Sequence, residues 1–119
     1  MERPRASVCM LLLAVGTAAF SSSEDHALTL DMIGKIESNI AMPKGARSLD
    51  AYARYYTMYA EKGSQILHGV FVLESKQSGV HIVERSKMPG VFDGGCLVVN
   101  FKYDLATDRV IEVFCNGVA

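Results

Sequence analysis

The chain has 119 residues, of which 50% are hydrophobic and 21% are charged, and its formal net charge is -1 at pH 7. This composition is typical of a folded domain with one modest core and excludes a disordered chain. Because Lys and Arg are not concentrated in any stretch, the sequence lacks the electrostatic basis for sequence-independent binding to nucleic acid or to anionic lipid.

The first 23 residues show the order of features that is typical of an export signal. Arg3 and Arg5 precede an uncharged apolar run over residues 8–20, and small residues follow it. The run is shorter than the roughly 20 residues of a membrane-spanning helix, so we expect a cleaved signal over residues 1–23 and no membrane span afterwards. The alternative is a buried N-terminal helix. Cleavage removes Cys9 and leaves two cysteines, an even number suited to an oxidising periplasmic or secreted location.

Residues 24–119 are predicted to form a single α+β domain. The segment SSSEDHALTLDMIGKIESNI predicts its first element, a helix, because apolar residues recur every four positions at Leu28, Met32, Ile36 and Ile40. Its serines and acids favour the helix start, and Asp31 and Lys35 can pair one turn apart on the exposed side. Pro43 ends the pattern, since the residue before a proline is pushed away from helical angles.

The segment that begins at Ser48 allows two interpretations. Its four clustered tyrosines stand at helical spacing behind a capping serine, but tyrosine is also a good strand former. We favour a strand because EKGS is a tight-turn sequence followed at once by QILHGVFVL, and a short helical turn over residues 48–51 is compatible with it. A turn centred on Lys62 and Gly63 gives the expected pairs: Tyr59 with Ile66, Tyr55 with Val70, Arg54 with Phe71 and Tyr52 with Leu73.

A short strand is then predicted at VHIVER, in a hairpin that places Val83 beside Val70. A connection rich in glycine, SKMPGVFDGG, leads to the last two strands. The predicted fold is therefore one N-terminal helix packed on an antiparallel sheet of about five strands, with the C-terminal hairpin closed by a disulfide.

That disulfide is predicted from two cysteines placed symmetrically about a turn. Cys96 and Cys115 bracket two apolar runs joined by DLATD, and both lie equally far from its centre. Folding there places Cys96 opposite Cys115, near enough for a disulfide that stabilises the fold by roughly 3 kcal/mol. The same register sets Lys102 against Arg109, a mild repulsion that a bulge near the turn would relieve. Without a CxxC motif, a redox or metal role is the lesser alternative.

Five residues are candidates for binding. Arg54 lies among tyrosines that include Tyr52 and Tyr56, and arginine stacks on aromatic rings. The alternative is that these tyrosines divide between the core and the outer side of the sheet. Asp93 and Asn116 lie in two polar loops that the disulfide would bring together, where backbone groups can hold a small ion or peptide or simply satisfy one another.

The sequence carries no recognisable catalytic constellation. His26, His68 and His81 lack metal-ligand spacing, and the chain contains no nucleophile elbow, P-loop, dinucleotide fingerprint or zinc-protease motif. We therefore expect no enzyme activity, no metal site and no cofactor.

The segments DGGCLVVNFKYD and CNGVA, together with YARYY and GVFV, resemble small exported bacterial proteins of uncharacterised function that end in a DGGC…CNG pattern. The likeness covers roughly residues 49–119 and brings no activity with it. QILHG, residues 65–69, is similar to the QxVxG loop of cystatins, with Leu67 in place of valine, and this likeness implies protease inhibition. The chain has no Trp for the second cystatin loop.

These features favour a non-catalytic binding or envelope accessory module whose partner is an envelope or secreted protein. The alternative is an inhibitor of a secreted or periplasmic hydrolase. A small hydrolase would need a cleft with an acid or histidine of perturbed pKa. The sequence does not fix the oligomeric state.

Overall fold

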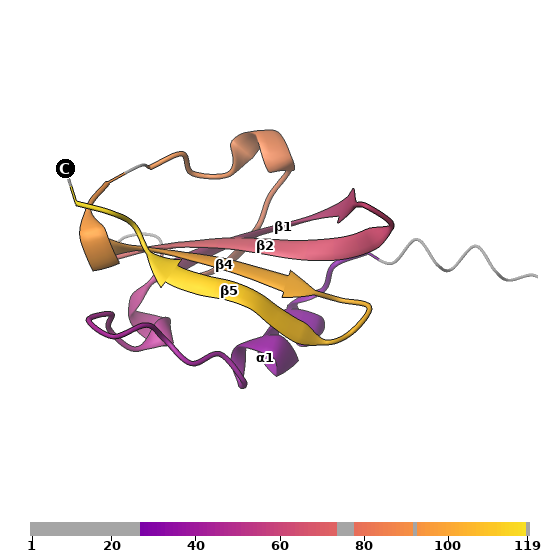
Figure 1. Ribbon diagram of the computed structural model, residues 1–119, viewed down its shortest axis with the longest axis horizontal. Coiled ribbons are helices and arrows are strands. Elements are labelled where there is room, and N and C mark those ends of the chain that lie inside the picture. Colours follow the sequence, from indigo (N-terminus) through magenta and orange to yellow (C-terminus); the bar gives the residue numbers. More distant parts are fainter. Residues whose placement is uncertain (1–26, 74–77, 92, 119) are drawn as a thin grey trace, which may run out of the picture.

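A curved five-stranded sheet wraps around one short helix (Figure 1). The computed structural model describes residues 27–73, 78–91 and 93–118. The export signal expected over residues 1–23 and His26 lie outside the described residues. The helix and strands are α1 (Leu30–Glu37), β1 (Ala53–Glu61), β2 (Ser64–Val72), β3 (Gly79–Ile82), β4 (Val98–Asp104) and β5 (Arg109–Cys115). Three single 3-10 turns accompany them: η3 (Leu49–Ala51), η4 (Arg85–Lys87) and η5 (Gly95–Leu97).

The strand order is β3-β1-β2-β4-β5, and the sheet is mixed. The prediction of a wholly antiparallel sheet was wrong, because β3 pairs with β1 and runs parallel to it. The expected hairpin between β2 and β3 is also absent, since β4 occupies that edge of β2 through seven residue pairs. β4 has three inward-facing residues to bury, whereas β3 has four residues and none is buried. β4, which buries more apolar surface, therefore takes the position beside β2.

The β1–β2 hairpin has the predicted register. Tyr59 lies opposite Ile66, and Tyr55 lies opposite Val70. The turn residues Lys62 and Gly63 have φ values of 52° and 83°, as a two-residue type I′ turn requires. The local sequence EKGS therefore fixes this register, and the alternative of a helix through the tyrosines is excluded.

The helix is shorter than its sequence pattern suggested. It begins after Thr29, whose side chain accepts a hydrogen bond from the Met32 amide at 3.2 Å, and it ends at Glu37. Ser38 caps the C-terminal end, so the chain leaves the helix before Pro43 is reached. The expected pairing of Asp31 with Lys35 is present, at 3.7 Å. The outer members of the apolar pattern, Leu28 and Ile40, still pack against the core, but from outside the helix.

The C-terminal hairpin contains the predicted disulfide in a different register. Val99 lies opposite Cys115, and Lys102 lies opposite Glu112 instead of Arg109. Cys96 is outside β4 because Gly94 and Gly95, both with positive φ, wind residues 95–97 into η5. That turn leads Cys96 back toward β5, and its Cα atom lies 4.6 Å from that of Cys115. The expectation that the two cysteines lie directly opposite one another was therefore wrong.

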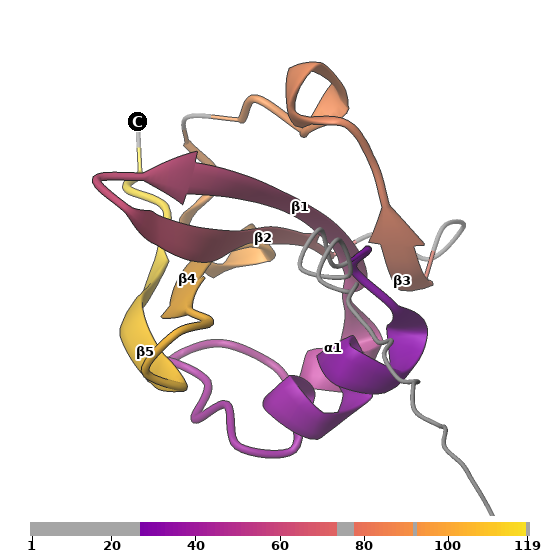
Figure 2. The same ribbon diagram turned by 90° about the vertical axis from the view of Figure 1, so that its right-hand side faces the viewer.

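The core lies between α1 and the concave side of the sheet (Figure 2). Ile33 and Ile36 of α1 meet Tyr52, which directly precedes β1, and aromatic and aliphatic side chains from the strands, chiefly Tyr56, Leu67, Phe71, Val99 and Phe101. At the centre, Gly69 leaves the room that two rings occupy, because a Cβ atom there would lie 2.9 Å from both Tyr56 and Phe71. Close approach of these rings explains why β2 carries a glycine in its interior.

Candidate binding site

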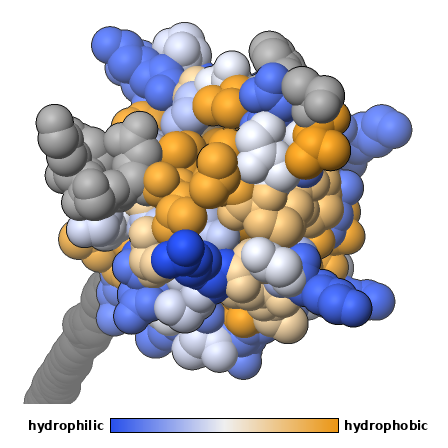
Figure 3. All heavy atoms as spheres, turned by 90° about the vertical axis from the view of Figure 1, so that its left-hand side faces the viewer, coloured by the Kyte–Doolittle hydropathy of each residue, from blue (hydrophilic) through white to orange (hydrophobic). Residues whose placement is uncertain are grey.

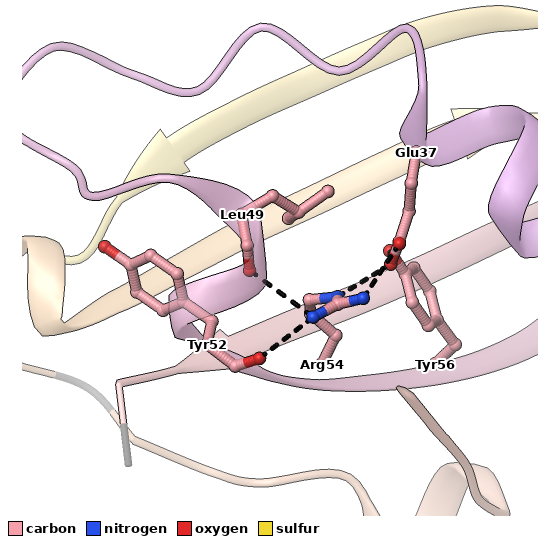
Figure 4. Close-up of polar contacts among 5 residues, drawn as sticks. All are labelled: Glu37, Leu49, Tyr52, Arg54 and Tyr56. Atoms are coloured by element: carbon pink, nitrogen blue, oxygen red, sulfur yellow. Dashed lines mark hydrogen bonds and ion pairs between the residues drawn. The ribbon is translucent and has the colours of Figure 1, made fainter. Parts of the chain in front are cut away.

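Arg54 is the polar centre of the contact between α1 and the sheet (Figure 4). Its Nε and Nη2 atoms donate to Oε2 and Oε1 of Glu37 at 2.9 and 3.0 Å, a bidentate pair. Each of the two side chains is only 12% exposed. Arg54 lies on β1 and Glu37 is the last residue of α1, so the pair connects the end of the helix to the sheet.

Neighbouring groups satisfy the rest of this network. Tyr56 donates its hydroxyl to Oε2 of Glu37 at 2.7 Å, and Nη1 of Arg54 donates to the Tyr52 carbonyl at 3.2 Å. The hydrogen bond to Glu37 raises the pKa of Arg54 against the opposing effect of burial. Burial, reinforced by the hydrogen bond to Glu37, raises the pKa of Tyr56 far above its usual value. Tyr56 therefore stays neutral at physiological pH, and the network is an internal structural contact.

Tyr52 is fully buried and connects three segments of the chain. Its hydroxyl donates to the Cys96 carbonyl at 2.7 Å and accepts from the Arg47 amide at 3.1 Å. The tyrosines at 52 and 56 and Arg54 thus lie side by side, as the sequence suggested. Their polar atoms are engaged inside the protein.

The two polar loops next to the disulfide also meet as expected. The Asn116 side chain donates to the carbonyls of Val91 and Asp93 at 2.8 and 3.0 Å and accepts from the Asn100 amide. The Gly95 amide donates to the carbonyl of residue 117 at 3.2 Å. The side chain of Asn116 therefore holds the loops together, while Asp93 is exposed beside them.

A groove that the sequence did not reveal lies at the other end of the core. It has a volume of about 440 Å³ and opens between α1, the β1–β2 turn and the β4–β5 turn, which is the end seen in Figure 2. Its apolar walls come from three separate segments and comprise Met32, Ile36, Met58 and Leu105. The charged groups Lys35 and Asp108 also line it.

Both charged groups of the groove already have partners. Lys35 pairs with Asp31, and a carboxylate oxygen of Asp108 accepts a hydrogen bond from the Tyr103 hydroxyl at 3.2 Å. Burial and this hydrogen bond raise the pKa of Tyr103. The groove therefore combines apolar walls with the lysine of an exposed ion pair and a hydrogen-bonded carboxylate.

A second apolar surface lies at the opposite end of the molecule. Leu97, Val118 and Val91 are 55%, 83% and 40% exposed, and Figure 3 shows apolar atoms gathered on this end. It is not enclosed by helix and turns as the groove is. Nothing in the described part of the chain covers it.

The convex side of the sheet carries the two described histidines. The His81 ring stacks on Tyr55 with centroids 4.9 Å apart. Burial, together with the positive charges of Lys102 and Arg85, lowers the pKa of His68. Within the described segments no three His, Cys, Asp or Glu side chains are grouped so that they could hold a metal ion.

The five residues that resemble the cystatin loop lie inside β2, which has β1 on one side and β4 on the other. Leu67 is fully buried, and Gly69 is buried beneath the rings described above. The structure therefore provides no loop at this motif.

Comparison with protein-family models, with curated proteins and with solved structures finds no match. Among the described residues, no helix is long and apolar enough to cross a membrane.

Proposed function

We propose that this chain is a small exported binding module, with no catalytic step of its own, that takes an apolar group of its partner into the groove between α1 and the two hairpin turns. The groove carries this proposal. Its volume of about 440 Å³ lies within the range of about 300–1,000 Å³ for small-ligand sites, and its walls are mostly apolar. Two of the wall residues, Met32 and Met58, are flexible side chains that adapt to different apolar shapes.

The proposal of a non-catalytic module is supported by the way polar groups are used. Arg54, Glu37 and Tyr56 form the most elaborate polar cluster of the described residues, but they lie in the contact between helix and sheet and bind one another. Catalysis needs an acid, base or nucleophile aimed at a site that a substrate can reach. The groove presents the partnered charges of Lys35 and Asp108 instead.

Export is supported by the disulfide between Cys96 and Cys115. Structural disulfides persist in oxidising compartments such as the periplasm and the extracellular space. In such a location the apolar group is expected to belong to an envelope or secreted partner.

Fluorescence titration with N-phenyl-1-naphthylamine, a neutral apolar probe, tests the groove. The purified protein should bind it saturably with one site per chain. Met32→Lys places a charge in the groove wall and should weaken binding at least tenfold, about 1.4 kcal/mol. Leu30→Lys is the matched control: it lies on the same helix, is 64% exposed and does not line the groove, so binding should not change.

Near-UV circular dichroism verifies that both variants keep their tertiary structure. Absence of saturable binding by the unmodified protein, or an equal loss in both variants, would contradict the proposal.

A further inference from the structure

β5 is an edge strand with an exposed apolar surface. It is the last strand in the order β3-β1-β2-β4-β5, and no strand of the described residues pairs with its outer edge. Val110, Ile111 and Phe114 are 42%, 51% and 46% exposed. An edge strand with unpaired backbone groups and apolar side chains is a template for pairing with another strand.

A bulge gives this edge a particular charge pattern. Lys102 pairs with Glu112, but the next residue of β4, Tyr103, pairs with Val110, so Ile111 is the extra residue of β5. Without a bulge, residues three apart on a strand face opposite sides of the sheet. With it, Arg109 and Glu112 lie on the same, convex side.

The strand partners of these two charges are charged as well. Arg109 lies opposite Asp104, and Glu112 lies opposite Lys102. Both β4 residues share the convex side with their own partners on β2, Ile66 and His68. Two pairs of opposite charge thus run across β4 and β5, Asp104 with Arg109 and Lys102 with Glu112. At the free edge the first pair presents the positive charge of Arg109, and the second presents the negative charge of Glu112.

We propose that two copies of this chain pair antiparallel through β5, with a twofold axis between Val110 and Ile111. Arg109 then lies opposite Glu112 of the second copy, and Val110 lies opposite Ile111 of the second copy. Across the dimer, Asp104 and Arg109 of one copy are followed by Glu112 and Lys102 of the other, so acid and base alternate. This row of four charges occurs twice because the interface is isologous. Opposite charges directly across an antiparallel pair are stabilising.

Other symmetric registers do not have this complementarity. An axis at Arg109 or at Glu112 places two like charges directly opposite each other, which is destabilising. An axis at Ile111 places Arg109 opposite Val113 and leaves its charge without a partner. The edge is thus complementary to itself in one register, and this is why a second copy is the occupant we infer.

The dimer should be weak. β5 has seven residues, and an interface of one strand pair lies below the standard buried area of about 1,600 Å². We therefore expect a dissociation constant in the micromolar range or above. Sedimentation equilibrium of the purified, oxidised protein, at concentrations from the micromolar range upward, can measure it.

Ile111→Lys tests the interface because it sets like charges beside the axis, and it should weaken dimerisation at least tenfold. Leu97→Lys is the control. Leu97 is similarly exposed, at 55%, but it lies in η5, next to the Cys115 end of β5 and outside the strand pair centred on residues 110 and 111. Glu112→Gln tests the register: it should weaken the dimer and reduce the dependence of its dissociation constant on salt.

Hydrogen exchange of the unmodified protein tests, without any substitution, whether the dimer interface lies on β5. Protection of residues 109–115 should rise with protein concentration, while that of the β3 edge should not. A monomer at the highest concentration would overturn the proposal and would show that the bulge blunts this edge. Equal effects of the two lysine substitutions, or protection elsewhere, would also overturn it. None of these results bears on the groove, since Met32 is not part of the interface.

Discussion

Arg54 and Glu37 join β1 to the end of α1 through two parallel hydrogen bonds of 2.9 and 3.0 Å. Replacing one member leaves the other buried without an opposite charge, which costs about 3–5 kcal/mol when both are deeply buried. Glu37 would keep only the hydrogen bond from Tyr56. Each side chain is 12% exposed, so water still reaches the pair and the cost should lie at the lower end of this range. We therefore expect Arg54→Met to lower the free energy of unfolding by about 3 kcal/mol.

Urea denaturation measures this change. The double variant Arg54→Met with Glu37→Leu should recover part of the loss, because no buried charge remains but the buried Tyr56 hydroxyl loses its acceptor. Lys35→Met, which breaks the exposed pair with Asp31, serves as the control and should change stability by less than about 1 kcal/mol. If Arg54→Met has an effect as small as Lys35→Met, the network does not hold the helix to the sheet.

The disulfide should contribute measurably to stability. Its cysteines are 19 residues apart, and a loop of that length corresponds to about 3 kcal/mol in the chain-entropy model. The double substitution of Cys96 and Cys115 by Ser should lower the midpoint of urea unfolding accordingly, with the fold retained in far-UV circular dichroism. An unchanged midpoint would show that the bond has no structural role.

Gly69 and Gly34 should respond in opposite directions to substitution by alanine. Gly69→Ala forces a Cβ atom against the rings of Tyr56 and Phe71, at 2.9 Å, and overpacking of this kind costs about 1–3 kcal/mol. Gly34 in α1 is exposed, and a Cβ atom there would meet no other atom within 4 Å, so alanine should stabilise the helix by up to about 1 kcal/mol. Thermal unfolding of both variants distinguishes them. A Gly69→Ala protein as stable as the unmodified one would contradict the packing of β2.

Stability should fall as the pH drops below the ordinary histidine pKa of 6.5, because burial lowers the pKa of His68 in the folded protein. Between the lowered folded value and 6.5, the unfolded chain binds more protons, so protonation favours unfolding. His68→Gln should therefore reduce the loss of unfolding free energy between pH 7.5 and 5.5, about one unit on either side of the usual value. An identical loss in the unmodified protein and the variant would contradict this assignment.

The parts of the fold that were predictable depend on neighbouring residues. The turn at Lys62 and Gly63 determines the β1–β2 register, and the two cysteines near the ends of the last hairpin indicate the disulfide. The register of that hairpin was wrong because Gly94 and Gly95 wind Cys96 out of the strand. The position of β3 depends on competition with β4 for one edge of β2, and no local pattern records that competition.

The groove was missed for a related reason. Met32, Met58 and Leu105 each fit an ordinary core pattern, and their arrangement around a hollow depends on how far the curved sheet lies from α1 at the hairpin ends. Arg54 was singled out among the tyrosines as a candidate for ligand binding. In the structure it binds Glu37, a partner 17 residues away that no local pattern indicates. The sequence therefore indicated which polar and aromatic residues lie together, but not the apolar surface that we propose binds a partner.

Methyl NMR of the protein during titration with N-phenyl-1-naphthylamine tests the proposed binding function most directly, because it locates the probe on the surface. We expect the largest shifts at the methyl groups of Met32, Met58 and Leu105, with small changes at Leu97 and Val118 at the opposite end. Shifts concentrated at Leu97 and Val118, or no saturable shifts at all, would contradict it.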